Sequence, residues 1–407
     1  MTHRYLYQHI AKHLREFRQM VFLTGPRQVG KTTLAQSFLN PIKSGLNYLN
    51  WDVASHRKWL TTQLFAGKQR LDGAEQAIAV FDEIHKYPRW KNAVKGLFDT
   101  SEPHTHWIVT GSALLNVYRR GQDSLLGRHF TYHLAPFSVA ELAAAGRPVP
   151  SLAELMQRVF ASPSPAATDA CTTLTRFGGF PEPLFRADQS FLVRWRRTRL
   201  DRLINQDLAV TETLRHLPLV EQLMFLLPER VGSPLSLNSL REDLEVHFAT
   251  VRHWMNLLER VFYGFSLRPF SQRRGRLLKK EAKWYLWDWT EINDPAIRFE
   301  NLVAVHLRKY VDYLNDLGLG ELTLHYVRDK EKREVDFLLC ERNRPQLLLE
   351  CKRTDTTVSR SLVPLARLLG VRRALQLVER GATMRERTEE GVRIQVCPAA
   401  AVLECLV

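Results

Sequence analysis

Cysteine is scarce in this sequence, and its pattern excludes two kinds of cross-linked small domain. The 407 residues include 5 cysteines, an odd number, with no Cys-x-x-Cys pair and no Cys/His spacing typical of zinc ligands. A disulfide framework pairs its cysteines, and a structural zinc site needs four closely spaced ligands. We therefore expect neither feature, and we expect a reducing compartment.

Long apolar runs are also missing. No stretch approaches the roughly 20 consecutive apolar residues that a membrane-spanning helix needs. Residues 1–25 are too polar for the core of a signal peptide, and they lead directly into a motif that must stay attached to the chain. We therefore expect a cytoplasmic protein without a membrane partner.

Acidic residues are too few to balance the basic ones. The chain has 58 Lys and Arg against 43 Asp and Glu, which gives a formal net charge of +15. The natural partner of such a field is a polyanion, either a nucleic acid or an anionic surface. A hydrophobic content of 45% indicates a globular chain, and 407 residues predict two to four domains.

The strongest motif lies near the N-terminus. Residues 20–39, MVFLTGPRQVGKTTLAQSFL, predict a strand, a Gly-x-x-x-x-Gly-Lys-Thr loop and a helix. This context lets the backbone N–H groups of the loop point at phosphates. We expect Lys31 to reach the β- and γ-phosphates of ATP and Thr32 to ligate Mg²⁺. The predicted nucleotide-binding residues of the loop are Gly25, Pro26, Arg27, Gln28, Val29, Gly30, Lys31, Thr32 and Thr33.

Two later strands also end in polar residues. AIAVFD ends at Asp82, which is suited to the Mg²⁺ shell, and the adjacent Glu83 is suited to polarise the attacking water. An Asp-Glu pair alone is also typical of the first turn of a helix. The strand HWIVT ends at Thr110 and is followed by Gly111 and Ser112, polar groups that are suited to sense the γ-phosphate.

The middle of the chain is helical and basic. Residues 143–168, rich in Ala, Pro and Ser, predict a boundary or a loose helical insert, and the cationic run at 194–208 is most often a solvated helix face. Residues 235–288 then predict two helices and a hairpin, the order of a winged helix. Its candidate phosphate contacts are Thr250, Arg252 and His253 on the second helix and Arg273, Arg274, Arg276, Lys279 and Lys280 on the wing. Such modules also serve as spacers or dimer surfaces.

Near the C-terminus, LLLECKRTD ends an apolar strand in Glu350 and Lys352, which share one strand face. A helix with Glu300 and a hairpin with Asp336 precede them, the order of the restriction-endonuclease-like fold. Two or more carboxylates there predict a site for Mg²⁺ or Mn²⁺ formed by Glu300, Asp336 and Glu350, with Lys352 near the scissile phosphate. The alternative is an exposed helix residue, a strand cap and a surface ion pair.

The motifs as a set resemble a known family. GPRQVGKTTL, FDEIHKYPRWKNAVKGLFD, VTGSALL, LLGRHFTYHLAPFSVAEL and GGFPEPLF are similar to blocks of the AAA-type ATPases of the AAA_14 class that carry a C-terminal DUF4143 domain. His85 departs from the Gln that is commoner there. The resemblance implies nucleotide chemistry by Lys31, Thr32, Asp82 and Glu83, a sensor at residues 110–112, and an arginine finger at Arg128. It also implies a homo-oligomer, in which the finger serves a neighbouring subunit. The alternative for Arg128 is a surface arginine before a strand.

The sequence therefore predicts an α/β protein with four parts. These are a P-loop AAA-like ATPase core with a parallel sheet at 1–150, a helical lid at 151–217, a winged helix at 218–288 and a PD-(D/E)xK nuclease-like domain at 289–407. We expect an ATP-hydrolysing, DNA-binding protein with a metal-dependent nuclease-like domain. One alternative is an ATP-gated regulatory switch whose C-terminal domain is a structural or protein-binding platform, and another is a transcription regulator that binds DNA without cleaving it.

Overall fold

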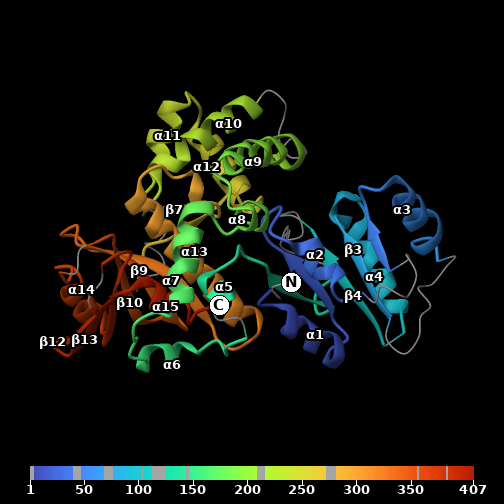
Figure 1. Cartoon of the computed structure of the whole chain (residues 1–407). Coiled ribbons are helices and arrows are strands. Elements are labelled where there is room, and N and C mark those ends of the chain that lie inside the picture. Colours follow the sequence, from blue (N-terminus) through green and yellow to red (C-terminus); the bar gives the residue numbers. More distant parts are fainter. Residues whose placement is uncertain are drawn as a thin grey trace. The chain divides into compact units, whose positions relative to one another are not determined.

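The computed structural model describes residues 4–39, 47–67, 77–102, 104–111, 125–143, 146–208, 216–271, 281–354, 357–381 and 384–407 (Figure 1). Two compact units make up the chain, one ending at Ala135 and the other extending from Pro136 to Val407. Ser112 and the five basic wing residues at 273–280 lie outside the described ranges. Within those ranges, no helix combines the length and the apolar character needed to cross a membrane.

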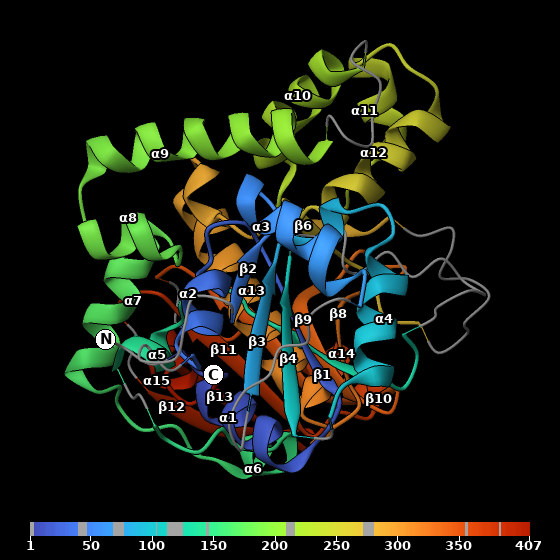
Figure 2. The same cartoon turned by 90° about the vertical axis from the view of Figure 1, so that its right-hand side faces the viewer.

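The first unit is built on a five-stranded sheet. Its strands lie in the order β2-β3-β4-β1-β5, and every pairing is parallel, as Figure 2 shows for the neighbours β3 and β4. The carboxyl ends of β1, β3 and β4 therefore meet at one edge of the sheet. The strands are β1 (Met20–Thr24), β2 (Tyr48–Asn50), β3 (Ala77–Asp82), β4 (Thr105–Thr110) and β5 (His129–His133).

Helices cover this sheet and complete its core. Every residue of β1 and β4 is buried, which is typical of parallel strands that are covered on both faces. Trp90 and Val94 of α4 pack into the same cluster as Phe22 of β1 and Phe81 of β3. The helical segments are α1 (Tyr7–Glu16), α2 (Lys31–Gln36), α3 (Ala54–Trp59), η1 (Leu60–Leu64), η2 (Ile84–Lys86) and α4 (Trp90–Thr100). The prediction of a parallel-sheet α/β core is confirmed.

The second unit opens with helices whose starts follow from local capping. Ser151 forms a capping box with Glu154, and the side chains of Ser164 and Asp188 accept hydrogen bonds from the first turns of α7 and α9. Residues 151–168 are thus largely helical. The segments are α5 (Val139–Ala143), α6 (Leu152–Gln157), α7 (Pro165–Phe177), α8 (Pro181–Arg186), α9 (Gln189–Arg202), η4 (Leu203–Leu208), α10 (Leu217–Leu226) and η5 (Leu227–Arg230).

Two helices and a hairpin follow in the predicted order. They are α11 (Leu237–Asp243), α12 (Phe248–Arg260), β6 (Gly264–Leu267) and β7 (Lys283–Leu286). The strands are antiparallel, with Leu267 opposite Lys283 and Ser266 opposite Trp284. Because side chains alternate along a strand, Lys283 and Tyr285 leave β7 on one face and Trp284 leaves it on the other.

A six-stranded mixed sheet ends the chain, in the order β12-β13-β11-β10-β9-β8. Strands β8, β9 and β10 pair antiparallel, β11 pairs parallel with both β10 and β13, and β12 pairs antiparallel with β13. Asp294 caps the long helix α13, whose first residue is proline. The segments are η7 (Trp289–Glu291), α13 (Pro295–Asp316), β8 (Leu322–Arg328), β9 (Glu334–Glu341), β10 (Arg344–Lys352), α14 (Leu362–Leu369), β11 (Arg373–Val378), β12 (Arg385–Glu389), β13 (Val392–Pro398) and α15 (Ala399–Leu403).

Candidate nucleotide site and carboxylate cluster

The loop between β1 and α2 has a backbone that depends on its glycines. Gly25 and Gly30 have φ of 146° and 99°, and Gln28 between them has φ of 61°. A Cβ on Gly25 would lie 2.2 Å from the carbonyl oxygen of Leu134, so this position has no room for a side chain. Val29 is fully buried, and its carbonyl accepts a hydrogen bond from Arg4 at 2.6 Å. The loop is thus held in one shape.

Lys31 lies against this loop. Its Nζ donates to the carbonyl oxygens of Gly25 and Pro26 at 2.8 and 2.7 Å, and only 7% of the residue is exposed. The neighbouring Thr32 donates from Oγ1 to Oδ2 of Asp82 at 2.9 Å, whereas Thr33 is exposed. The loop, the lysine and the hydroxyl therefore meet the carboxyl end of β3, as the motif predicts.

Asp82 is the centre of a hydrogen-bond network at this edge of the sheet. Its carboxylate accepts hydrogen bonds from Thr32, from the Thr110 hydroxyl on β4, from Tyr48 at 2.7 Å and from Asn50 at 3.3 Å. Tyr48 and Asn50 both belong to β2, where Asn50 lies opposite Asp82 in the parallel register. Four donors from two strands and a helix fix the orientation of a carboxylate that is only 3% exposed.

Glu83 follows in a conformation that L-residues adopt rarely. Its φ is 57°, in the left-handed region, and its N–H donates to the carbonyl of Thr110 at 3.1 Å. Burial raises the pKa of Glu83, although the nearby charges of Lys31, Lys86 and Arg27 lower it in part. Its buried Oε2 accepts no hydrogen bond from the described residues. The same Oε2 lies 3.7 Å from the Lys86 ammonium, an ion pair rather than a hydrogen bond. A buried carboxylate with a raised pKa is suited to take a proton.

His85 lies 3.6 Å from Glu83, measured between Nε2 and Oε2. Burial and the charges of Lys86, Arg27 and Lys31 lower the pKa of His85 to about 3, so its imidazole is neutral near pH 7. A neutral ring does not form an ion pair with Glu83. The departure from the family's glutamine thus keeps an uncharged polar group at this position.

Arg128 lies at the other edge of the sheet. The N–H of Met20, where β1 begins, donates to the carbonyl of Arg128 at 2.8 Å. Strand β1 has five residues, so roughly 16 Å separates this edge from the carboxyl edge where Asp82 lies. The guanidinium donates to both carboxylate oxygens of Asp99 on α4, at 2.7 and 3.2 Å. Arg128 therefore does not join the phosphate loop of its own chain.

Two of the predicted nuclease residues, Glu300 and Asp336, gather in the second unit, together with Lys283 and Glu334, two residues that sequence analysis missed. The ammonium of Lys283 on β7 lies 2.8 Å from Glu334, 3.3 Å from Glu300 and 3.5 Å from Asp336. Lys283 is 1% exposed. Burial alone would lower its pKa, but the three carboxylates outweigh burial and raise it. Lys283 is therefore a permanently charged ammonium among carboxylates.

The remaining contacts of this carboxylate cluster extend from the same place. Tyr285 donates to Oε1 of Glu300 at 2.7 Å, and the backbone N–H of Cys351 donates to Oδ2 of Asp336 at 2.9 Å. Lys352 donates to Oε1 of Glu350 at 2.7 Å, while Oε2 of Glu350 is buried without a hydrogen bond from the described residues. Among the described residues, no three His, Cys, Asp or Glu side chains are arranged to hold a metal ion.

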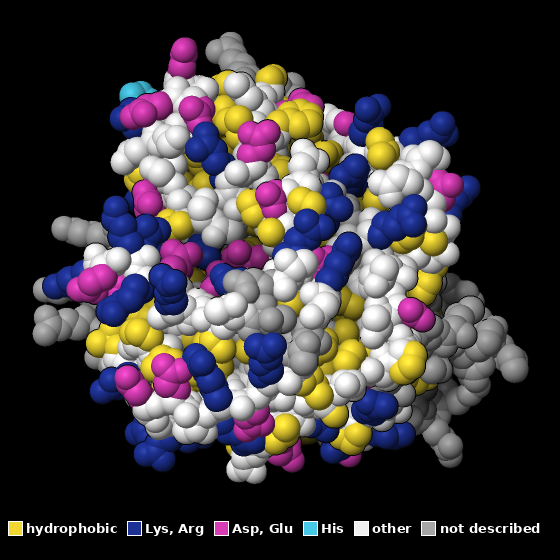
Figure 3. Space-filling view, turned by 60° about the vertical axis from the view of Figure 1, so that its left-hand side comes forward, with side chains coloured by type: hydrophobic (Ala, Val, Ile, Leu, Met, Phe, Trp, Pro, Cys, Tyr) yellow, Lys and Arg dark blue, Asp and Glu magenta, His cyan; other side chains and the backbone are white. Residues whose placement is uncertain are grey.

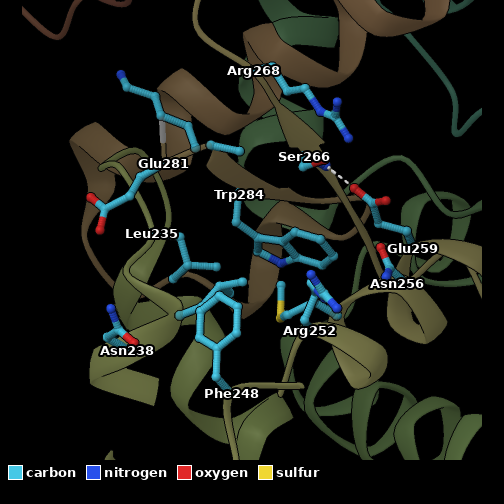
Figure 4. A pocket seen from close by; sticks show the side chains of 14 residues that line it. Leu235, Asn238, Phe248, Arg252, Asn256, Glu259, Ser266, Arg268, Glu281 and Trp284 are labelled. Atoms are coloured by element: carbon cyan, nitrogen blue, oxygen red, sulfur yellow. Dashed lines mark hydrogen bonds between the residues drawn. The ribbon is translucent and has the colours of Figure 1, made fainter. Parts of the chain in front are cut away.

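A pocket of about 520 Å³ lies between α11, α12 and the hairpin β6–β7. Figure 4 shows the Trp284 indole at its centre, with Phe248 and Arg252 of α12 on one side and Arg268 on another. Trp284 is 1% exposed, whereas Phe248 is 41% exposed. Thr250 is half-buried, and Arg252, His253 and Arg268 are exposed, so α12 and the end of β6 present cations beside an aromatic surface.

Comparison with known proteins identifies the two ends of the chain. The AAA domain model AAA_14 matches residues 17–143, and the model DUF4143, a domain of unknown function, matches residues 297–401. The two ends of the chain are thus similar to the AAA and DUF4143 families, respectively. This result confirms the family resemblance that the motifs predicted. A further domain of unknown function, DUF8612, matches residues 169–290 between them.

This chain has distant relatives that match most of its length. An uncharacterized protein of Haemophilus influenzae is 21% identical over 78% of this chain and 78% of its own. An uncharacterized protein of Mycobacterium tuberculosis is 22% identical over 84% of this chain and 72% of its own. Solved structures also match, among them the following two. The Aeropyrum pernix ORC1 protein in complex with DNA is 17% identical, with a TM-score of 0.32, over 74% of this chain and 90% of that one. The Bacillus subtilis DNA clamp loader delta protein is 10% identical, with a TM-score of 0.27, over 77% and 99%.

Proposed function

We propose that the AAA domain binds ATP with Mg²⁺ and hydrolyses it. The observation that carries this proposal is the meeting of four groups at one sheet edge: the phosphate-loop Lys31, the Thr32 hydroxyl, Asp82 and Glu83. Thr32 and Asp82 offer hard oxygen donors 2.9 Å apart, which fits a magnesium ion better than a softer metal. Bound between the phosphates and these oxygens, Mg²⁺ would neutralise charge on the transferred phosphoryl group.

The roles of the residues follow from their chemistry. Lys31 exchanges its contacts with the loop carbonyls for the β- and γ-phosphates, since an ammonium binds phosphate more strongly than a neutral carbonyl. Glu83 accepts a proton from the attacking water through Oε2, which accepts no hydrogen bond from the described residues. Thr110 holds Asp82 in position, and Ser112, outside the described residues, completes the proposed sensor.

We propose Arg128 as a finger that acts on a neighbouring subunit in a homo-oligomer. Its place at the opposite sheet edge from the phosphate loop supports action on another chain's nucleotide rather than on its own. Before it can act in this way, Arg128 must leave Asp99. Both groups of this ion pair are partly exposed, so the pair itself stabilises the fold only weakly.

The proposed partner of the ATPase is nucleic acid, in particular DNA. The net charge of +15 favours a polyanion. Figure 3 shows Lys and Arg side chains scattered over one face among Asp and Glu, without a single basic patch. We therefore assign phosphate contact to the exposed Arg252 and His253 of α12 and to the wing, as in a winged helix that binds the backbone without reading bases.

For the DUF4143 domain, two functions remain to be compared. The nuclease hypothesis, with Mg²⁺ or Mn²⁺ held by Glu300, Asp336 and Glu350 and with Lys352 as the catalytic cation, is favoured by the proximity of these residues. The alternative, an ATP-gated switch with a structural or protein-binding platform, is favoured by the engagement of the same carboxylates with Lys283. Because a buried ammonium already neutralises them, the geometry supports the platform better.

One set of assays tests these proposals. ATP hydrolysis by the purified protein is measured with and without single-stranded, duplex and branched DNA, and cleavage of the same labelled DNAs is followed with Mg²⁺ or Mn²⁺. We expect hydrolysis that DNA stimulates and that Arg252→Ala leaves unstimulated. Hydrolysis that is indifferent to all three DNAs would contradict the nucleic-acid partner. DNA cleavage that Asp336→Ala abolishes would contradict the platform and support the nuclease.

A further inference from the structure

The carboxylate cluster of the second unit is already occupied by a cation of the chain itself. Glu300, Glu334 and Asp336 surround the Lys283 ammonium at 3.3, 2.8 and 3.5 Å, and an ammonium has three N–H donors to match them. The lysine is 1% exposed, so water does not replace these contacts. A cation of the chain itself thus fills the space among these carboxylate oxygens.

The cluster is nearly neutral without any added ion. Besides Lys283, the guanidinium of Arg328 lies 3.5 Å from Glu334, and Lys352 lies 2.7 Å from Glu350. Three cations thus face four carboxylates. A magnesium or manganese ion binds oxygen at about 2.1 Å, so it would stand within about 4 Å of the Lys283 ammonium if it shared these oxygens. Repulsion between the two cations opposes that arrangement.

Lys283 and its carboxylate partners come from different elements of the second unit. It lies on β7, whereas Glu300 lies on α13 and the other two carboxylates lie on β9. Tyr285, two residues along the same face of β7, donates to Glu300 as well. Charge-assisted hydrogen bonds therefore fasten the hairpin β6–β7 to the helix and sheet of the DUF4143 domain.

We propose that Lys283 is the resident cation of this cluster, that it excludes a divalent metal from Glu300 and Asp336, and that it locks the hairpin onto the DUF4143 domain. This inference concerns only the second unit and does not depend on ATP hydrolysis. It disagrees with the metal site that the order of residues predicts, because that prediction did not include a lysine from the hairpin.

Manganese binding without nucleotide tests the proposal. Mn²⁺ is titrated into wild type, Lys283→Met and the double variant Lys283→Met/Asp336→Asn, and bound Mn²⁺ is counted by electron paramagnetic resonance. We expect Lys283→Met to bind one more Mn²⁺ per chain than wild type and the double variant to lose that ion. A wild type whose bound Mn²⁺ disappears in Asp336→Asn would overturn the proposal. So would a folded Lys283→Met that gains no Mn²⁺.

Thermal unfolding provides the second measurement. Removing a buried ammonium from its carboxylates is expected to lower the Tm of Lys283→Met by roughly 10 °C, and added Mn²⁺ is expected to restore most of it. Lys352→Met is the matched control: it removes a lysine that is 35% exposed and pairs with Glu350 alone, so its Tm should fall less and should not respond to Mn²⁺. If Lys283→Met fails to fold, the Tm of wild type still tests the proposal. A wild-type Tm that Mn²⁺ raises through binding at Asp336 would refute the proposal that Lys283 excludes the metal.

Discussion

Tyr48 provides a sharp test of the nucleotide site, because sequence analysis gave it no role. Its hydroxyl donates to Asp82 at 2.7 Å, and Tyr48→Phe removes this oxygen while keeping the ring. A hydrogen bond to a charged acceptor contributes about 1.5–3 kcal/mol. Asp82 keeps its contacts with Thr32, Thr110 and Asn50, so we expect a cost near the lower end, about 1.5 kcal/mol.

Loss of this hydrogen bond should change both the thermal stability of the protein and the Mg²⁺ dependence of its ATP hydrolysis. The Tm of the AAA domain is expected to fall by about 5 °C, given the size of this unit. If Asp82 orients Mg²⁺, loss of a partner that holds it should also raise the Mg²⁺ concentration for half-maximal hydrolysis by about 10-fold, at the lower end of effects seen for residues behind metal ligands. Magnesium titrations of ATP hydrolysis and thermal unfolding are the assays.

The control for Tyr48→Phe is Tyr87→Phe. Tyr87 belongs to the same unit, but its ring stacks on Trp51, with centroids 4.9 Å apart, and it does not contact Asp82. This control should leave the Mg²⁺ dependence unchanged. If Tyr48→Phe hydrolyses ATP with the Mg²⁺ dependence and Tm of wild type, the Tyr48 hydroxyl does not support Asp82 as a magnesium ligand.

Three further predictions concern the same domain. Lys31→Ala should lose ATP affinity by at least 10-fold in calorimetric titration, because the buried ammonium that we propose binds the phosphates is removed, and unchanged affinity would argue against its role. Gly25→Ala should unfold at a lower Tm and bind no ATP, since its Cβ would lie 2.2 Å from a carbonyl oxygen; a wild-type Tm would show that the loop can relax. Mixing inactive Arg128→Ala with inactive Glu83→Gln should restore part of the hydrolysis, and no recovery in oligomers shown to contain both chains would count against action between subunits.

Residues joined by one motif or one strand were the most predictable from sequence. The loop of residues 25–32 has a fixed spacing, and the apolar strand before Asp82 places that carboxylate at the carboxyl edge of the sheet. Parallel strands bring such ends together whatever the intervening sequence. The sequence alone therefore predicts that Lys31, Thr32 and Asp82 lie close together. The same holds for Glu350 and Lys352, which share a strand face and form an ion pair at 2.7 Å.

Contacts between distant elements were the least predictable. Tyr48 and Asn50 lie on a three-residue strand, and only the register opposite β3 shows that they face Asp82. Tyr48 and Asn50 are two residues apart, so they share one face of β2 if the segment is a strand. Three residues are too few, however, to show a pattern of polar and apolar residues from which that strand could be predicted. Lys283 was hidden in the same way, because its partners come from α13 and β9 and nothing in its own strand indicates buried carboxylates.

The basic segment of α9 shows a similar limit. Its arginines form one cationic run in the sequence, yet Arg199 is 2% exposed and donates to Glu291 at 3.2 Å, whereas Arg194 and Arg197 are exposed. Burial of one arginine within such a run depends on an acidic partner about 90 residues later in the chain, on η7. Charge counting along the helix cannot separate a structural arginine from one that is available to a polyanion.

ATP hydrolysis by the AAA domain, as we propose it, depends on Glu83 as the proton acceptor. The most direct measurement compares phosphate release and ATP binding in wild type and Glu83→Gln, a substitution that keeps the size of the side chain and removes its basicity. The account predicts ATP binding within about 3-fold of wild type and hydrolysis slower by 10²–10⁴-fold, the usual contribution of a positioned general base. Equal rates of phosphate release from the two proteins would contradict it.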